Sequence, residues 1–188
     1  FNGVVLGFNV PILKEAEEHA ASKEIKIILS DIIYRLIDEY KRWKDEKKKA
    51  IEMAELNKLV RGGMFRFLPN HTFRQSNPAV IGADIMSGRI KTGEYVMNKS
   101  GKRLAKISGI EEERESINVA EAGKSVSVAM EDVTVGRQIN EGDIFYIEVP
   151  EDDFRKMKEL KDYLSRPDIE LLKEVAEIKR KNNPAWGL

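Results

Sequence analysis

The spacing of apolar and polar positions changes several times along the chain, and each change predicts a new structural element. Residues 4–10 and 25–29 are short apolar runs rich in β-branched side chains, which is typical of buried strands. Residues 13–24, between them, carry many charges and few apolar positions, and we expect a helix there. A strand, a helix and a strand in this order favour a parallel pair. Because two strands cannot enclose a core, we expect further strands of this domain upstream.

Residues 31–61 predict one long helix with a polar middle. Ser30 or Asp31 can cap its start, and apolar residues recur at helical spacing near both ends but are almost absent from 41–49. No glycine or proline interrupts the segment before Gly62. Such a helix is typical of a solvent-bridging connection between two domains, and its length would be about 45 Å. Two helices joined by a polar hinge are the alternative.

Residues 62–150 show short alternating or apolar runs separated by glycine-containing turns. Six or seven such runs predict a small closed antiparallel β-barrel. Residues 151–188 return to helical spacing and predict two helices that pack on the barrel, the second capped by Ser165, before an irregular tail. The two apolar stripes are Phe154, Met157, Leu160 and Leu164, and Ile169, Leu172, Val175 and Ile178. Whether Trp186 in the tail docks on the barrel stays open.

The composition excludes several kinds of chemistry. The chain has no cysteine and only two histidines, which are far apart in the sequence, so we expect neither a disulfide nor a metal site. Gly123-Lys124-Ser125 resembles the end of a phosphate-binding loop, but position 118 is not glycine and a strand pattern follows, so we predict a barrel turn. We find no catalytic residue and no nucleotide site. No apolar run approaches the ~18 residues that a membrane span needs.

Charge is unevenly spread, although the net charge is zero. Residues 61–110 hold nine basic and two acidic residues, whereas residues 111–153 hold three basic and thirteen acidic residues. A positive field over one part of the barrel can bind phosphate. The alternative is that strand pairing brings the two blocks together and cancels them.

Aromatic residues are interleaved with the cations of the barrel, and that combination is typical of RNA binding on small barrels. Phe65 and Phe67 are expected in the core. Phe73 lies in a predicted loop, residues 69–78, where exposure and burial are about equally expected.

Several motifs resemble those of translational GTPases. Residues 77–83 (NPAVIGA), 88–93 (GRIKTG), 119–123 (VAEAG) and 141–143 (EGD) are similar to the second-domain barrel of these proteins. Residues 5–10 (VLGFNV) and 32–38 (IIYRLID) make the likeness more specific. The chain resembles, over essentially its whole length, the C-terminal half (domains three and four) of the archaeal and eukaryotic initiation factor five-B family, orthologous to bacterial initiation factor two.

The resemblance implies an α+β multi-domain fold. Residues 1–30 would be the second half of a parallel α/β/α sandwich, 31–61 a long connecting helix, 62–150 the closed antiparallel barrel, and 151–188 two helices packed on it plus a tail. It also implies a cytoplasmic parent protein, which we expect to be a monomer, with a GTPase domain and its GTP and Mg²⁺ lying upstream. This piece would then hold no cofactor and would not itself be an enzyme.

The resemblance further implies that the barrel holds the acceptor end of initiator methionyl-tRNA and that the intact protein promotes joining of ribosomal subunits. The aminoacyl pocket of relatives maps near Phe73, Gly82 and Ala83. The cations expected to contact the tRNA backbone are Arg66, Arg74, Lys102 and Arg103.

The two C-terminal helices of the family take the acidic, apolar tail of initiation factor one-A. By charge complementarity, the residues expected to bind this tail are Lys158, Lys161, Lys173 and Lys179. The alternative function is a module that mainly docks proteins, either factor one-A or the ribosome.

Overall fold

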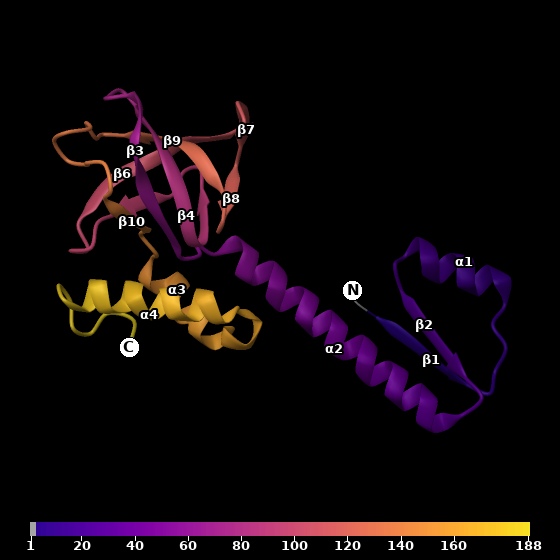
Figure 1. Cartoon of the computed structure of the whole chain (residues 1–188). Helices are drawn as coiled ribbons and strands as arrows, with labels where there is room; N and C mark the ends of the chain where they lie inside the picture. Colours follow the sequence, from indigo (N-terminus) through magenta and orange to yellow (C-terminus); the bar gives the residue numbers. More distant parts are fainter. Residues whose placement is uncertain (1–2) are drawn as a thin grey trace. The chain divides into compact units, whose positions relative to one another are not determined.

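The computed structural model describes residues 3–188, which form two compact units that divide after Ala54 (Figure 1). The first unit contains strand β1 (Val4–Phe8), helix α1 (Lys14–Ser22), strand β2 (Lys26–Ser30) and most of helix α2 (Ile33–Lys58). β1 and β2 pair in parallel, from Val4 opposite Lys26 to Phe8 opposite Ser30, as the sequence predicts. The predicted burial of the first strand is wrong for the described residues, because Val5, Leu6 and Phe8 are each about half exposed.

Helix α2 runs without a break from Ile33 to Lys58, so the alternative of two helices with a hinge is wrong. Its polar middle is exposed, with an ion pair between Lys48 and Glu52 one helical turn apart. The last turn belongs to the second unit, where Leu56 and Leu59 are buried. The chain leaves the helix through Gly62 and Gly63. A Cβ on Gly63 would lie 2.0 Å from the carbonyl oxygen of Arg89, so this approach to the barrel requires glycine.

The barrel of the second unit is closed by six antiparallel strands. They are β3 (Gly63–Arg74), β4 (Ala79–Lys91), β5 (Tyr95–Met97), β6 (Arg103–Glu112), β9 (Ser125–Glu131) and β10 (Ile144–Ile147). The ring order is β3, β10, β5, β6, β9, β4 and back to β3. The short strands β7 (Glu115–Ile117) and β8 (Val119–Glu121) pair with β6 and β4. This is the predicted barrel, and Phe65 and Phe67 are fully buried in its core.

Two predictions about local structure are wrong. Phe73 is not in a loop, because β3 continues to Arg74 and pairs with β4 through irregular register. The first C-terminal helix is shorter than its stripe implies: α3 (Glu151–Glu159) ends before Leu160, and a short 3₁₀ turn, η1 (Lys161–Tyr163), follows.

The second C-terminal helix, α4 (Arg166–Arg180), starts at the predicted cap, where the Ser165 side chain accepts the backbone N–H of Asp168 in a capping box. Figure 1 shows α3 and α4 side by side at one end of the barrel. Helix α4 is held there by the Tyr146 hydroxyl, which donates to Glu174 at 2.6 Å, and by Lys179, which donates to Glu148 at 2.5 Å. The tail is folded back, and Trp186 is buried.

Candidate nucleic-acid interface and partner groove

Phe73 and Gly82 line one hollow on the outer face of the barrel. The hollow has a volume of about 240 Å³, and Phe73 remains 62% exposed at its edge. The other lining residues come from β3, β6, β9 and the adjoining turns: Leu68, His71, Glu111, Glu113, Arg114, Ser125, Val126 and Ser127. An exposed aromatic ring above a hollow of mixed polarity can stack on a planar or apolar ligand group.

Gly82 has a steric role in this hollow. A Cβ on Gly82 would lie 2.7 Å from the Cβ of His71, closer than packed side chains approach. Because position 82 has no side chain, His71 can lie over β4, with its ring edge-on to Phe73 at 6.4 Å between centroids. The Nδ1 atom of His71 is 2.7 Å from the carbonyl oxygen of Pro69. Gly82 therefore sets the depth of the hollow.

His71 was not among the residues that the sequence assigned to the site. One signal was available, since residues two apart on a strand share a face, and His71 precedes Phe73 by two. The prediction of a loop at residues 69–78 concealed that relation.

Two of the predicted cations, Arg66 and Arg74, lie on β3 and differ in their surroundings. Arg74 is exposed near the end of β3, opposite Val80. Arg66 is about half exposed and lies 3.5 Å from the Oδ2 atom of Asp84, while the Oδ1 atom of Asp84 accepts the Ser125 hydroxyl at 2.6 Å. Arg114 lines the hollow itself, although the sequence did not assign it there.

Lys102 and Arg103 lie elsewhere on the barrel. Arg103 stands eight residues before Glu111 on β6, which is about 26 Å along an extended strand. Its guanidinium covers the Tyr95 ring at 4.2 Å from the centroid and pairs with Glu148, whose hydrogen bond raises the pKa of Arg103. Ala83 is fully buried in the core. The structure therefore does not bring these three residues together with Phe73 at the surface.

The acidic and basic blocks of the barrel are partly paired, as the cancellation alternative expects. Arg103 pairs with Glu148, and Lys106 lies opposite Glu131 in the sheet. Arg89 likewise lies opposite Glu121. Arg74, in contrast, is exposed at the β3–β4 hairpin.

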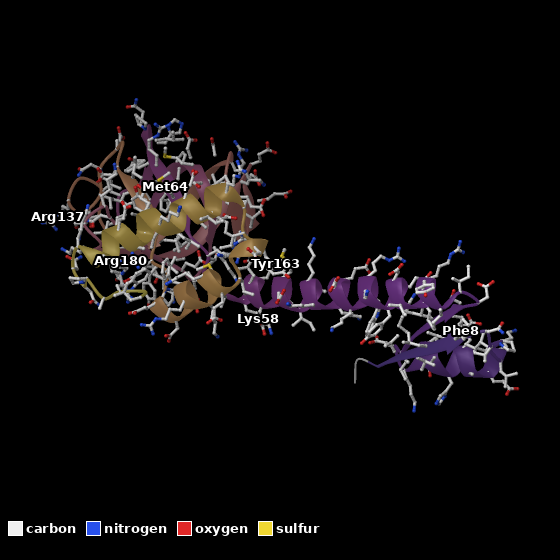
Figure 2. All side chains as sticks on the ribbon, turned by 90° about the horizontal axis from the view of Figure 1, so that it is seen from below. Phe8, Lys58, Met64, Arg137, Tyr163 and Arg180 are labelled. Atoms are coloured by element: carbon white, nitrogen blue, oxygen red, sulfur yellow. The ribbon has the colours of Figure 1, made fainter. Side chains whose placement is uncertain are left out.

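A groove between α3 and α4 gathers three of the four lysines expected to bind a partner. It has a volume of about 560 Å³ and an apolar floor made by Phe154, Met157, Leu164, Ile169, Leu172 and Ala176. Lys158, Lys161, Lys173 and Arg180 line it, together with one acidic residue, Glu177. Figure 2, seen from below, labels Arg180 at the end of α4. The groove is apolar inside and positively charged at its edges.

Lys179 does not line this groove. Its ammonium group contacts Glu148 on the barrel, and its side chain is only 15% exposed. The helical period explains the difference, since Lys173, Ala176 and Arg180 share one face of α4 and Lys179 faces the barrel. Arg180, which the sequence did not assign, takes the place expected for Lys179.

Two other kinds of site find no support. Within residues 3–188 there is no group of three or more histidine, cysteine or acidic side chains that could hold a metal ion. No helix among the described residues has the length and apolar character needed to cross a bilayer.

Comparison with known proteins connects this geometry to translation. The model of the family "Translation-initiation factor 2" matches residues 1–41, and the model "Elongation factor Tu domain 4" matches residues 61–146. The probable translation initiation factor IF-2 of Methanocella arvoryzae is 43% identical over 185 residues, or 98% of this chain. The chain belongs to the IF-2 family of archaeal translation initiation factors.

Other members of the IF-2 family agree with this assignment. The probable IF-2 of Hyperthermus butylicus is 40% identical over the whole chain. The crystal structure of GDP-bound aIF5B from Aeropyrum pernix matches 98% of the chain at 39% identity, with a TM-score of 0.70. The chain spans about a third of these relatives, 31% in each case, and corresponds to the C-terminal region of the IF-2 family.

Proposed function

We propose that the barrel binds the acceptor end of initiator methionyl-tRNA on the face that carries Phe73. The observation that supports this is the hollow lined by His71, Phe73, Gly82 and the cation Arg114. Arg74, which follows Phe73 on β3, is exposed. The ring and the apolar lining suit the aminoacyl group and a terminal base, and the cations suit the phosphates. Arg66 and Arg114 are the nearest further candidates for phosphate contact.

In the intact protein, this binding would serve ribosomal subunit joining. A GTPase domain with GTP and Mg²⁺ would lie upstream, and this region would contribute tRNA binding rather than catalysis. Helix α2 would connect the two activities.

The first test compares binding of the 188-residue chain to methionylated and uncharged initiator tRNA across a salt series. We expect tighter binding of the charged form, with affinity falling as salt rises because phosphate contacts release counterions. Phe73→Ala should weaken binding of the charged form by roughly tenfold, since one stacking contact is lost. Arg74→Ala should reduce the slope of log binding constant against log salt concentration by about 1.

Lys102→Ala is the matched control, because Lys102 lies on a different part of the barrel. It should weaken binding much less than Arg74→Ala. Equal affinity for the two tRNA forms at every salt concentration would contradict the proposal.

A substitution at Gly82 tests the shape of the hollow. Gly82→Ala places a methyl group 2.7 Å from the Cβ of His71 and must displace that residue. The control is Gly109→Ala, whose new methyl group would meet only the Ala129 Cβ, at 3.8 Å. We expect Gly82→Ala to weaken binding of methionylated tRNA and Gly109→Ala to leave it unchanged. Equal effects would mean that the hollow is not the binding site.

The groove between α3 and α4 favours a second function, docking of the acidic, apolar tail of initiation factor one-A. An apolar floor edged by Lys158, Lys161 and Lys173 is complementary to such a peptide in both polarity and charge. Titration of the chain with a synthetic peptide of that tail tests the proposal. Lys173→Glu should abolish binding, and retention of full affinity in this variant would contradict it.

A further inference from the structure

The C-terminal tail is held against the end of the α3–α4 groove. The Trp186 ring packs on the Phe154 ring at 4.6 Å between centroids, and Trp186 is only 7% exposed. Phe154 also forms part of the groove floor. The tail therefore covers one face of Phe154, and Phe154 also lines the groove.

The tail also fixes two of the cations that line the groove. The Nζ atom of Lys158 donates to the carbonyl oxygen of Gly187 at 3.0 Å. The Nε atom of Arg180 donates to the carbonyl oxygen of Trp186 at 2.9 Å. A carbonyl oxygen is a neutral acceptor, so these bonds order the two side chains without cancelling their charges. An acidic ligand would find both cations already in place.

Gly187 is needed for this arrangement. Its φ angle is +68°, which side chains rarely adopt, and a Cβ there would lie 2.6 Å from the Phe154 ring. Its N–H donates to a carboxylate oxygen of Glu151 at 3.0 Å. The backbone at Gly187 is thus tied to α3 by both its N–H and its carbonyl group.

We propose that the tail preorganises the groove for acidic segments by holding Lys158 and Arg180, with Trp186 and Gly187 as positioning residues. The proposal rests on the docking function of the groove. It assigns to the C-terminal tail the role of setting the preference of the groove for acidic ligands. Ordering a long flexible side chain on binding opposes association, and the tail removes that cost for two such side chains. We expect the tail to raise the affinity for an acidic peptide by about tenfold.

The test uses two peptides of equal length on the full 188-residue chain. One is the acidic tail of factor one-A, and the other has every aspartate and glutamate replaced by the corresponding amide. Trp186→Ala and Gly187→Val release the tail by different means, the first by removing the buried ring and the second by a clash with Phe154. Trp186→Phe retains an aromatic anchor, and Leu188→Ala changes a side chain that is 75% exposed.

We expect Trp186→Ala and Gly187→Val to weaken binding of the acidic peptide by about tenfold, and to change binding of the amide peptide far less. Trp186→Phe should restore most of the loss, and Leu188→Ala should have no effect. A collapsed groove would weaken both peptides equally, so the difference between them separates positioning from folding. In a Trp43→Phe background, Trp186 is the sole tryptophan, and its quenching by acrylamide reports whether the tail is docked.

Three results would overturn the proposal. Unchanged affinity for the acidic peptide after release of the tail would mean that the tail does not position the cations. Tighter binding would mean that it competes with the ligand. Absence of acidic-peptide binding by the unaltered chain would remove the docking function itself and the positioning role with it.

Discussion

Glu94, at the turn between β4 and β5, shows how far burial can shift the pKa of a single side chain. Glu94 is only 7% exposed, and one of its carboxylate oxygens accepts the backbone N–H of Lys91 at 3.0 Å. Burial raises the pKa of Glu94 to about 7, against the lowering effects of that hydrogen bond and of the Arg89 and Lys91 charges. The folded chain therefore retains a proton that the unfolded chain loses near pH 4.5.

This difference predicts a pH-dependent effect of Glu94→Gln. Between the unfolded and folded pKa values the native state binds more protons, so Glu94 makes the free energy of unfolding fall as the pH rises from about 4.5 to about 7. Glutamine keeps an acceptor for the Lys91 N–H and cannot ionise. The stability difference between variant and unaltered chain should shift in favour of the variant by on the order of 3 kcal/mol between pH 5 and pH 8. Urea unfolding at both pH values measures it, and a constant difference would contradict the prediction.

At the scale of elements, α4 carries two lysines with different roles: one attaches the helix to the barrel, and the other lines the partner groove. Lys179 faces the barrel and contacts Glu148, whereas Lys173 lines the groove. We expect Lys179→Met to lower the free energy of unfolding by roughly 1–3 kcal/mol, because a charged hydrogen bond in a half-buried position is lost. Lys173→Met should leave stability nearly unchanged and weaken acidic-peptide binding. Urea unfolding and peptide titration of both variants test this, and the reverse pattern would contradict it.

The same ion pair links the attachment of α4 to pH. Burial raises the pKa of Glu148, but hydrogen bonds from Arg103 and Lys179 outweigh burial, and the net pKa is lowered. A carboxyl group with a lowered pKa contributes stability that is present above its unfolded pKa and is lost as the pH falls through its folded pKa. The contribution of Glu148 to the attachment of α4 is therefore present at neutral pH and is lost in acid.

The elements also show what local sequence can predict. Helix α2 and the parallel pair β1–β2 follow directly from the spacing of apolar residues. The course of β3 to Arg74 does not, because Pro69, Asn70 and Pro78 are typical of a loop, and only pairing with β4 extends the strand. Leu171 is only 3% exposed although the predicted stripe omits it, because its side chain packs against the backbone at Gly62 and Gly88.

The candidate sites were predictable to the extent that they depend on nearby positions. Phe73 and Gly82 could be paired through the resemblance. The lysines of the groove could be chosen through the resemblance together with charge complementarity. The contacts of Lys179 with Glu148 and of Arg180 with Trp186 depend on how the helix and the tail fold back. Such contacts join residues from separate elements, or residues that meet because the tail folds back on α4. No periodic pattern in the sequence predicts them.

At the scale of the whole molecule, α2 is the element shared by both units, and its stiffness is open to test in the full-length protein. Lys47 and Lys48 lie in its exposed polar middle. Two glycines inserted between them would lower the local helix stability by about 2 kcal/mol, because glycine is a poor helix former. The barrel core lies outside this segment, so we expect tRNA binding to be unchanged.

If α2 couples an upstream GTPase to the barrel mechanically, the Gly-Gly insertion should slow ribosomal subunit joining, measured by light scattering after rapid mixing of the subunits. An Ala-Ala insertion at the same place is the matched control, since it adds the same length and the same rotation of about 200° but keeps the helix stiff. A slower rate with Gly-Gly than with Ala-Ala would assign the effect to stiffness. Equal slowing would assign it to length and rotation, and joining at the unaltered rate in both variants would mean that α2 acts only as a tether.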